Sequence, residues 1–141
     1  MKISTKGRYA LRLMIDLAAH GEGEFVALKD IAERQDISKK YLEQIVPLLG
    51  KAELLRADRG NRGGYALTRP PEKYTVGEIL RVTEGNMSPV ACLQYKENTC
   101  PRRAECTALP VWEGLNKVIA DYLDGITLRD ILDGKDKDHC I

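Results

Sequence analysis

The chain has 141 residues, of which 43% are hydrophobic and 30% are charged, and its formal net charge is +1. This composition suits one globular domain with an accessory element, and no apolar run approaches the roughly 20 residues that a bilayer-spanning helix needs. Arg8, Arg12 and Asp16 interrupt the apolar residues at the start of the chain. This pattern argues against a secretory signal and predicts a cytoplasmic protein that has no membrane partner.

The first predicted element is a helix over residues 5–20, where apolar side chains recur at helical spacing and Thr5 is the expected cap. Gly21 ends this pattern. Phe25 and Val26 fit either a short strand or a packed loop.

Two short helices are predicted next, over residues 28–35 and from Ser38 onward, with a tight connection at Asp36 and Ile37. The hydroxyl of Ser38 can cap the second of them. Pro47 has no backbone N–H, and we therefore expect it to kink the second helix or to end it near residue 46.

A β-hairpin is predicted after these helices, with strands at Leu54–Ala57 and Tyr65–Thr68. The basic loop between the strands contains three glycines, which permit the positive φ angles that a hairpin tip needs. They are Gly60, Gly63 and Gly64, and Pro70 and Pro71 close the unit.

The second half begins with a short helix that Thr75 caps and Gly85 ends, followed by residues 86–107, which show no helical period. Pro110 suits the first turn of a long last helix. The apolar stripe of this helix is Val111, Leu115, Val118, Ile119, Tyr122 and Leu123, and a small capped turn follows at residues 127–132. The stripe is wide enough to pair with a second copy of itself, and burial within its own chain is the alternative.

These elements predict a mainly α fold with a small β-hairpin wing, which is a winged helix-turn-helix plus a long C-terminal dimerisation helix. The expected division is a DNA-binding domain over residues 1–73 and a connecting helix with a cysteine loop over 74–107. A dimerisation helix with its terminal turn follows over 108–133, and a flexible tail over 134–141.

A winged helix-turn-helix binds DNA through the exposed face of its second helix and through its wing. Residues 1–73 hold 14 Lys and Arg against 10 Asp and Glu, so the basic part of the chain coincides with this unit. Lysines suit phosphates, Glu and Gln can read cytosine and adenine, and Arg suits a narrow minor groove. The candidate DNA-binding residues are Ser38, Lys39, Lys40, Glu43 and Gln44 on the helix, and Arg59 and Arg62 in the hairpin loop. A solvated helix face and a winged helix that binds another protein are the alternatives.

Three cysteines, Cys92, Cys100 and Cys106, fall within one loop of 15 positions. Thiolates bind iron and zinc well, and three of them in one loop can converge on a single centre. Composition does not separate an iron–sulfur cluster from zinc, and three unconnected small residues are the alternative. An enzyme or an electron carrier has little support, because the chain has no CxxC pair, no phosphate-binding loop and only two histidines.

Four segments together resemble the Rrf2 family of bacterial transcription regulators, which includes IscR-, NsrR-, RirA- and CymR-like members. The segments are MKISTKGRYALRLMIDLA, ISKKYLEQIVPLL, RGNRGGYALTR and TVGEILRVTEG. The resemblance implies a homodimer that binds a partly palindromic double-stranded DNA operator. It also implies that Ser38, Tyr41, Glu43 and Gln44 lie at or near the DNA and that Arg59 enters the minor groove. Tyr41 fits the core equally well.

The resemblance extends to the cysteines, because the cluster-binding branch of this family carries three of them in the corresponding loop. It implies that Cys92, Cys100 and Cys106 hold an iron–sulfur cluster, either 2Fe-2S or 4Fe-4S, which would control the binding of DNA. The chain departs from the family at the fourth ligand, since Leu109 and Arg8 occupy the two positions that supply it in IscR- and NsrR-like members. Glu105, a water, a thiol compound or a partner residue could complete the site. A CymR-like repressor that holds no cluster and is controlled by a thiol or a partner is the alternative.

Overall fold

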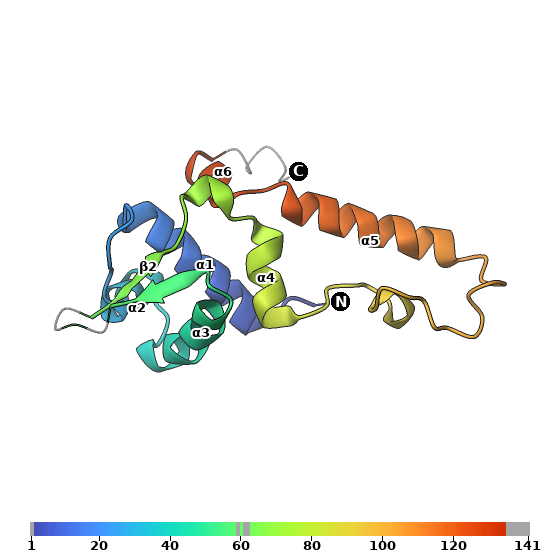
Figure 1. Cartoon of the computed structure of the whole chain (residues 1–141), viewed down its shortest axis with the longest axis horizontal. Helices are drawn as coiled ribbons and strands as arrows, with labels where there is room; N and C mark the ends of the chain where they lie inside the picture. The colour runs from blue at the N-terminus through green and yellow to red at the C-terminus, as the bar shows by residue number, and fades with distance from the viewer. Residues whose placement is uncertain (1, 59, 61–62, 135–141) are drawn as a thin grey trace.

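The computed structural model describes residues 2–58, 60 and 63–134 as a mostly helical fold with one small antiparallel sheet (Figure 1). It confirms the predicted winged helix-turn-helix class with a long helix near the C-terminus. The helices are α1 (Thr5–His20), α2 (Leu28–Gln35), α3 (Lys39–Lys51), α4 (Val76–Glu84), α5 (Leu109–Asp124) and α6 (Leu128–Leu132), and the strands are β1 (Leu55–Ala57) and β2 (Tyr65–Leu67). Two short 3-10 turns lie at Pro71–Lys73 and Ala91–Leu93.

The core is built around α1, which packs against α2, α3, α4 and α6. Leu13 and Met14 of α1 are fully buried, as are Ile45 and Leu49 of α3 and Ile79 of α4. Since α2, α3, α4 and α6 all pack against α1, this helix fixes how α2 and α3 sit relative to the rest of the chain.

The cap of α1 lies one residue before the predicted Thr5. The side chain of Ser4 accepts a hydrogen bond from the backbone N–H of Gly7 and donates one to Glu84 at 2.8 Å. Ser4 is the cap because its extended backbone (φ −69°, ψ 162°) brings the hydroxyl over the first turn of α1. The carboxylate of Glu84, at the end of α4, holds Ser4 in this position.

One of the two outcomes predicted for Pro47 is wrong, because α3 does not end near residue 46 but continues through the proline to Lys51. Leu42, Ile45, Val46 and Leu49 are buried on both sides of the proline, so core packing holds the helix before and after it. Pro47 itself is exposed, and water can therefore reach the carbonyl that loses its usual donor.

The hairpin pairs β1 with β2 in the register Leu55 with Leu67, and each strand is one residue shorter than predicted. Val26 forms a single bridge to Tyr65, so the segment before α2 becomes a one-residue extension of the sheet. Gly64 lies at this contact with φ +124°, and a Cβ there would lie 2.7 Å from the carbonyl oxygen of Val26. A glycine is therefore required where the hairpin crosses the chain.

The helix α5 and residues 86–108 form an arm that extends from the domain on the side opposite the hairpin (Figure 1). Pro110 occupies the first turn of α5, as the sequence predicts. Among the described residues, no helix is long and apolar enough to cross a bilayer.

Candidate nucleic-acid interface and cysteine loop

The helix-turn-helix is formed by α2 and α3, joined by a sharp turn at Asp36 and Ile37. Asp36 has the left-handed backbone conformation (φ 53°, ψ 49°), and its N–H closes the end of α2 on the carbonyl of Ala32. Ile37 is buried and anchors the turn. Ser38 then caps α3, since its hydroxyl accepts a hydrogen bond from the N–H of Tyr41 at 3.0 Å.

A buried carboxylate fixes α2 against α1. Asp16 is 1% exposed, and both of its oxygens accept hydrogen bonds from Arg34, at 2.7 and 3.1 Å. The amide of Gln35 adds a third bond at 2.9 Å, and Arg12 returns to the side chain and the carbonyl of Gln35. Burial raises the pKa of Asp16, but the hydrogen bonds from Arg34 and Gln35 outweigh it and leave the pKa below its ordinary value. The carboxylate is therefore ionised at neutral pH.

The outer face of α3 carries the predicted DNA-binding residues. Lys39, Lys40, Glu43 and Gln44 are all exposed, while the opposite face of the helix is buried. The single ion pair among them joins Lys39 to Glu43 at 3.9 Å, and both side chains are more than half exposed. Such a pair is weak, so both groups can exchange it for a ligand.

Tyr41 packs against α1 instead of pointing fully outward. It is half-buried, and its ring meets that of Tyr9 edge to face at 5.3 Å between centroids. The guanidinium of Arg12 lies over the Tyr9 ring, 5.3 Å from its centroid. Tyr41 therefore combines a packing role with a position near the start of the recognition helix.

The two predicted wing arginines, Arg59 and Arg62, lie outside the described residues. The described part of the wing is anchored by Arg56, which stacks on Phe25 at 4.8 Å and donates to the carbonyl of Gly23 at 3.1 Å. A hollow of about 340 Å³ separates the wing from α3. Lys29, Lys39 and Glu43 line it together with the wing residues Gly63 and Gly64, so charged side chains of α2 and α3 border the space between the wing and α3.

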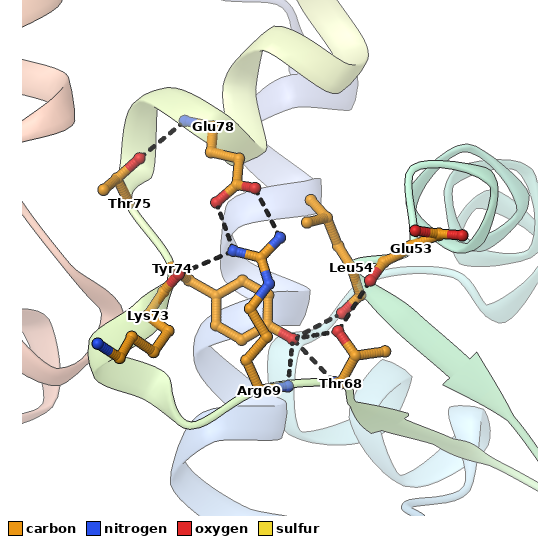
Figure 2. Close-up of polar contacts among 8 residues, drawn as sticks. All are labelled: Glu53, Leu54, Thr68, Arg69, Lys73, Tyr74, Thr75 and Glu78. Carbon is orange, nitrogen blue, oxygen red and sulfur yellow. Dashed lines mark hydrogen bonds and ion pairs between the residues drawn. The ribbon is translucent and has the colours of Figure 1, made fainter.

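The base of the wing is fastened to α4 through Tyr74 (Figure 2). The buried hydroxyl of Tyr74 donates to the carbonyl of Leu54 at 2.8 Å and accepts from the N–H groups of Thr68 and Arg69, at 2.8 and 3.2 Å. Arg69 stacks on the Tyr74 ring at 4.7 Å and forms a two-bond ion pair with Glu78. Both strands of the wing are thus tied to the segment that leads into α4.

The three loop cysteines are half-buried and make no disulfide. Among the described residues, no three His, Cys, Asp or Glu side chains gather closely enough to hold a metal ion. The thiols therefore supply a donor set that suits iron or zinc, but this conformation of the loop does not assemble it. The hydrogen bonds of the loop near Cys100 are local, from Cys100 N–H to Asn98 at 2.9 Å and from Arg103 to the Cys100 carbonyl at 3.2 Å.

Among the described residues, no carboxylate or imidazole forms a metal-binding group with two of the cysteines. Leu109 is the first residue of α5, and Arg8 is an exposed residue of α1 that donates to Thr5. Glu105 is exposed in the loop, and His20 closes the far end of α1. His139 and Cys140 lie outside the described residues.

The arm exposes much of the apolar stripe predicted for α5. The exposed fractions are 62% for Val111, 41% for Leu115 and 64% for Val118, and Trp112 is exposed as well. Ile119 and Leu123 turn the other way and line a small cavity of about 180 Å³ against α4 and the loop. The stripe is therefore divided between a face toward the chain and a face toward solvent.

Sequence reasoning missed the polar contacts that hold these elements together. Asp16 is an interruption in the apolar pattern of α1, which is a signal for a buried charge, but its partners in α2 are 18 and 19 positions away. Tyr74 gave no such signal, because its partners are backbone groups of the wing.

The chain is similar to known proteins over nearly its whole length. A family model described as "Rrf2: Iron-dependent Transcriptional regulator" matches residues 3–134. The HTH-type transcriptional regulator CymR of Bacillus subtilis is 44% identical over 132 residues, which cover 93% of this chain and 89% of CymR.

Two solved structures are similar in both sequence and fold. One is described as T. potens IscR, with 43% identity, a TM-score of 0.74 and coverage of 97% of this chain and 90% of that one. The other is CymR (YrzC), described as the global cysteine regulator of B. subtilis, with 42% identity, a TM-score of 0.74 and coverage of 93% and 95%.

Proposed function

This chain belongs to the Rrf2 family of transcriptional regulators, and from this membership we propose that it is a dimeric, sequence-specific DNA-binding regulator of the cytoplasm whose cysteine loop controls operator binding. The observation that carries the proposal is the recognition helix. Its apolar face is buried in the core, while Lys40, Glu43 and Gln44 are exposed, and Glu43 lines the hollow beside the wing. These are groups that contact phosphates and base edges in the major groove.

The proposed roles follow the chemistry of each side chain. Lys39 and Lys40 would neutralise phosphates, and Glu43 and Gln44 would read bases. Arg59 and Arg62 would enter the minor groove, which concentrates negative potential where it is narrow. Ser38 combines its cap with a place at the positive end of α3, and the phenol of Tyr41 lies within the first turn of the same helix.

The proposed homodimer rests on the arm. An exposed apolar face of this extent on a helix that projects from the domain favours an interface, and a second copy of α5 offers the matching surface. A two-fold pair of recognition helices would then contact two half-sites of a partly palindromic operator about one turn of DNA apart.

The proposed sensor is the loop of residues 86–108. Its three thiols are only partly buried and form no disulfide, and the loop connects α4 with α5. An iron–sulfur cluster is one candidate for what the loop binds, and reversible thiol chemistry without a cluster is the other. Either would act by ordering the loop around the three cysteines, which this conformation does not bring together.

The test separates these two modes of control. The protein is purified without oxygen, its visible spectrum is recorded, and iron and acid-labile sulfide are measured, with Cys100→Ala as the variant and Cys140→Ala as a control thiol outside the loop. We expect the wild type and Cys140→Ala to share one stoichiometric content of iron and sulfide and one visible charge-transfer band, and Cys100→Ala to lose both.

A colourless, iron-free wild type would refute the cluster and leave thiol control. The matching assay measures operator binding of the loaded and the unloaded protein, or of the reduced and the oxidised protein. Equal affinity in all of these states would refute control by the loop.

A further inference from the structure

Two ion pairs, each with two hydrogen bonds, link α4 to two other parts of the chain through the neighbouring residues Glu78 and Arg81. Arg69, which follows β2, pairs with Glu78 through two bonds of 2.6 and 2.9 Å (Figure 2). One turn further along, Arg81 pairs with Asp124 at the end of α5 through two bonds of 2.7 and 2.9 Å. Paired bonds of this kind fix the relative orientation of both partners.

The two pairs form one continuous series of charges. Glu78 and Arg81 are three residues apart, which places them as neighbours on one side of the helix. The hydrogen bond to Asp124 is the main cause of the raised pKa of Arg81, and the negative charge of Glu78 adds to it. We refer to Arg69, Glu78, Arg81 and Asp124 as the charged ladder, which joins the wing at one end to α5 at the other.

Backbone hydrogen bonds also join the start of α4 to the segment that follows α5. The N–H of Val76 donates to the carbonyl of Ile126 at 2.9 Å, and the N–H of Leu128 donates to that of Tyr74 at 3.1 Å. Gly77 lets α5 approach, because a Cβ at this position would overlap the carboxylate of Asp124. The segment from Tyr74 to Gly77 therefore touches the wing on one side and the end of α5 on the other.

Stability alone does not account for this arrangement. The four side chains are between 33% and 45% exposed, and ion pairs at such exposure add little to the free energy of unfolding. What two-bond pairs supply at the surface is a fixed angle between the elements that they join.

We propose that the charged ladder sets the angle between the wing and α5, and thereby the spacing of operator half-sites that the dimer accepts. This inference rests on the proposed function, since it assumes that α5 pairs two chains and that the wing contacts DNA. Arg69, Glu78, Arg81 and Asp124 are thus positioning residues that determine specificity without touching DNA.

The test compares Asp124→Asn with Asp121→Asn. Both variants remove one negative charge from α5. Asp121 pairs with Lys117 within the same helix, whereas Asp124 pairs with Arg81 of α4. Loss of a negative charge by itself strengthens the attraction to DNA. If Asp124→Asn binds DNA more weakly and Asp121→Asn does not, the weaker binding is therefore not an effect of net charge.

The DNA is selected by the wild type from a random duplex pool, and its spacer is then lengthened or shortened by one or two base pairs. A duplex with a single half-site serves as the third probe. We expect Asp124→Asn to lose about fivefold or more in affinity for the selected operator and to discriminate less between spacers. Its affinity for the single half-site and its melting temperature should match those of Asp121→Asn.

Glu78→Gln interrupts the ladder at its centre and should give the same loss, and the double variant should lose no more than either single one. If Asp124→Asn keeps the spacer preference of the wild type, the ladder inference is refuted while the proposed function stands. If the wild type selects no DNA at all, the proposed function itself fails and the inference fails with it.

Discussion

Removal of one hydroxyl group, in Tyr74→Phe, tests whether the wing is held by the phenol of Tyr74. This hydroxyl donates to the carbonyl of Leu54, accepts from the backbone N–H groups of Thr68 and Arg69, and lies 3.1 Å from the hydroxyl of Thr68. Tyr74 and Leu54 are 0% and 1% exposed, so the Leu54 carbonyl loses its phenol donor in a site that water does not reach.

A buried polar group without a partner costs about 1–3 kcal/mol. The N–H groups of Thr68 and Arg69 lie nearer to solvent and add less, which gives a total loss of about 3 kcal/mol in the free energy of unfolding. For a chain of this length, that loss corresponds to a melting temperature lower by roughly 10 °C.

The assay is urea unfolding followed by circular dichroism at fixed protein concentration, because a dimer gains stability with concentration. Tyr95→Phe is the matched control, since Tyr95 is 75% exposed in the loop and should change nothing. The slope of the transition should be the same in all three proteins. A Tyr74→Phe variant within 0.5 kcal/mol of Tyr95→Phe would show that the phenol does not hold the wing.

Further substitutions test the buried carboxylate of Asp16, the exposed face of α3 and the exposed face of α5. Asp16→Asn should lower the free energy of unfolding by about 2 kcal/mol at pH 7, less than for a fully buried pair because Arg34 is 35% exposed. The pKa of Asp16 lies below its ordinary value of 3.8, so the difference in free energy of unfolding between the wild type and Asp16→Asn should persist above about pH 4 and shrink as the pH falls further. A difference that grows in acid would contradict this role of the carboxylate. Lys40→Ala should weaken binding to every DNA sequence and reduce the salt slope by about 1, whereas Gln44→Ala should cost about 1–3 kcal/mol on the operator alone; titrations at several salt concentrations distinguish the two. Val118→Glu should leave the chain folded but monomeric in sedimentation, and a stable dimer of this variant would exclude the α5 face as the interface.

Short-range patterns predicted most elements of this fold. The bounds of α1 and α2 coincide with the apolar period, and the start of α5 follows from Pro110. The predicted end of α3 near Pro47 is wrong because the rule for proline describes what a single helix loses, whereas the buried neighbours of Pro47 hold the helix on both sides of it.

The candidate site could be predicted only in part, for a different reason. The exposed face of α3 follows from helical periodicity, but the groups that orient it depend on pairs far apart in the chain. Asp16 with Arg34 and Arg81 with Asp124 are separated by 18 and 43 positions, and no local pattern encodes such partners. The cysteines show the same limit, since their spacing indicates a shared ligand but does not gather them in this conformation.

The direction of the wing is determined at its root. Gly64 lies against the carbonyl of Val26, the N–H of Asp58 bonds to the carbonyl of Gly64 at 2.9 Å, and Tyr65 exchanges two bonds with Val26. For protein engineers who wish to retarget such a regulator, this root marks a graft boundary. Segments exchanged between Asp58 and Gly64 would start and end on an already oriented stem, whereas any side chain placed at position 64 itself would collide with the carbonyl of Val26 and shift the hairpin.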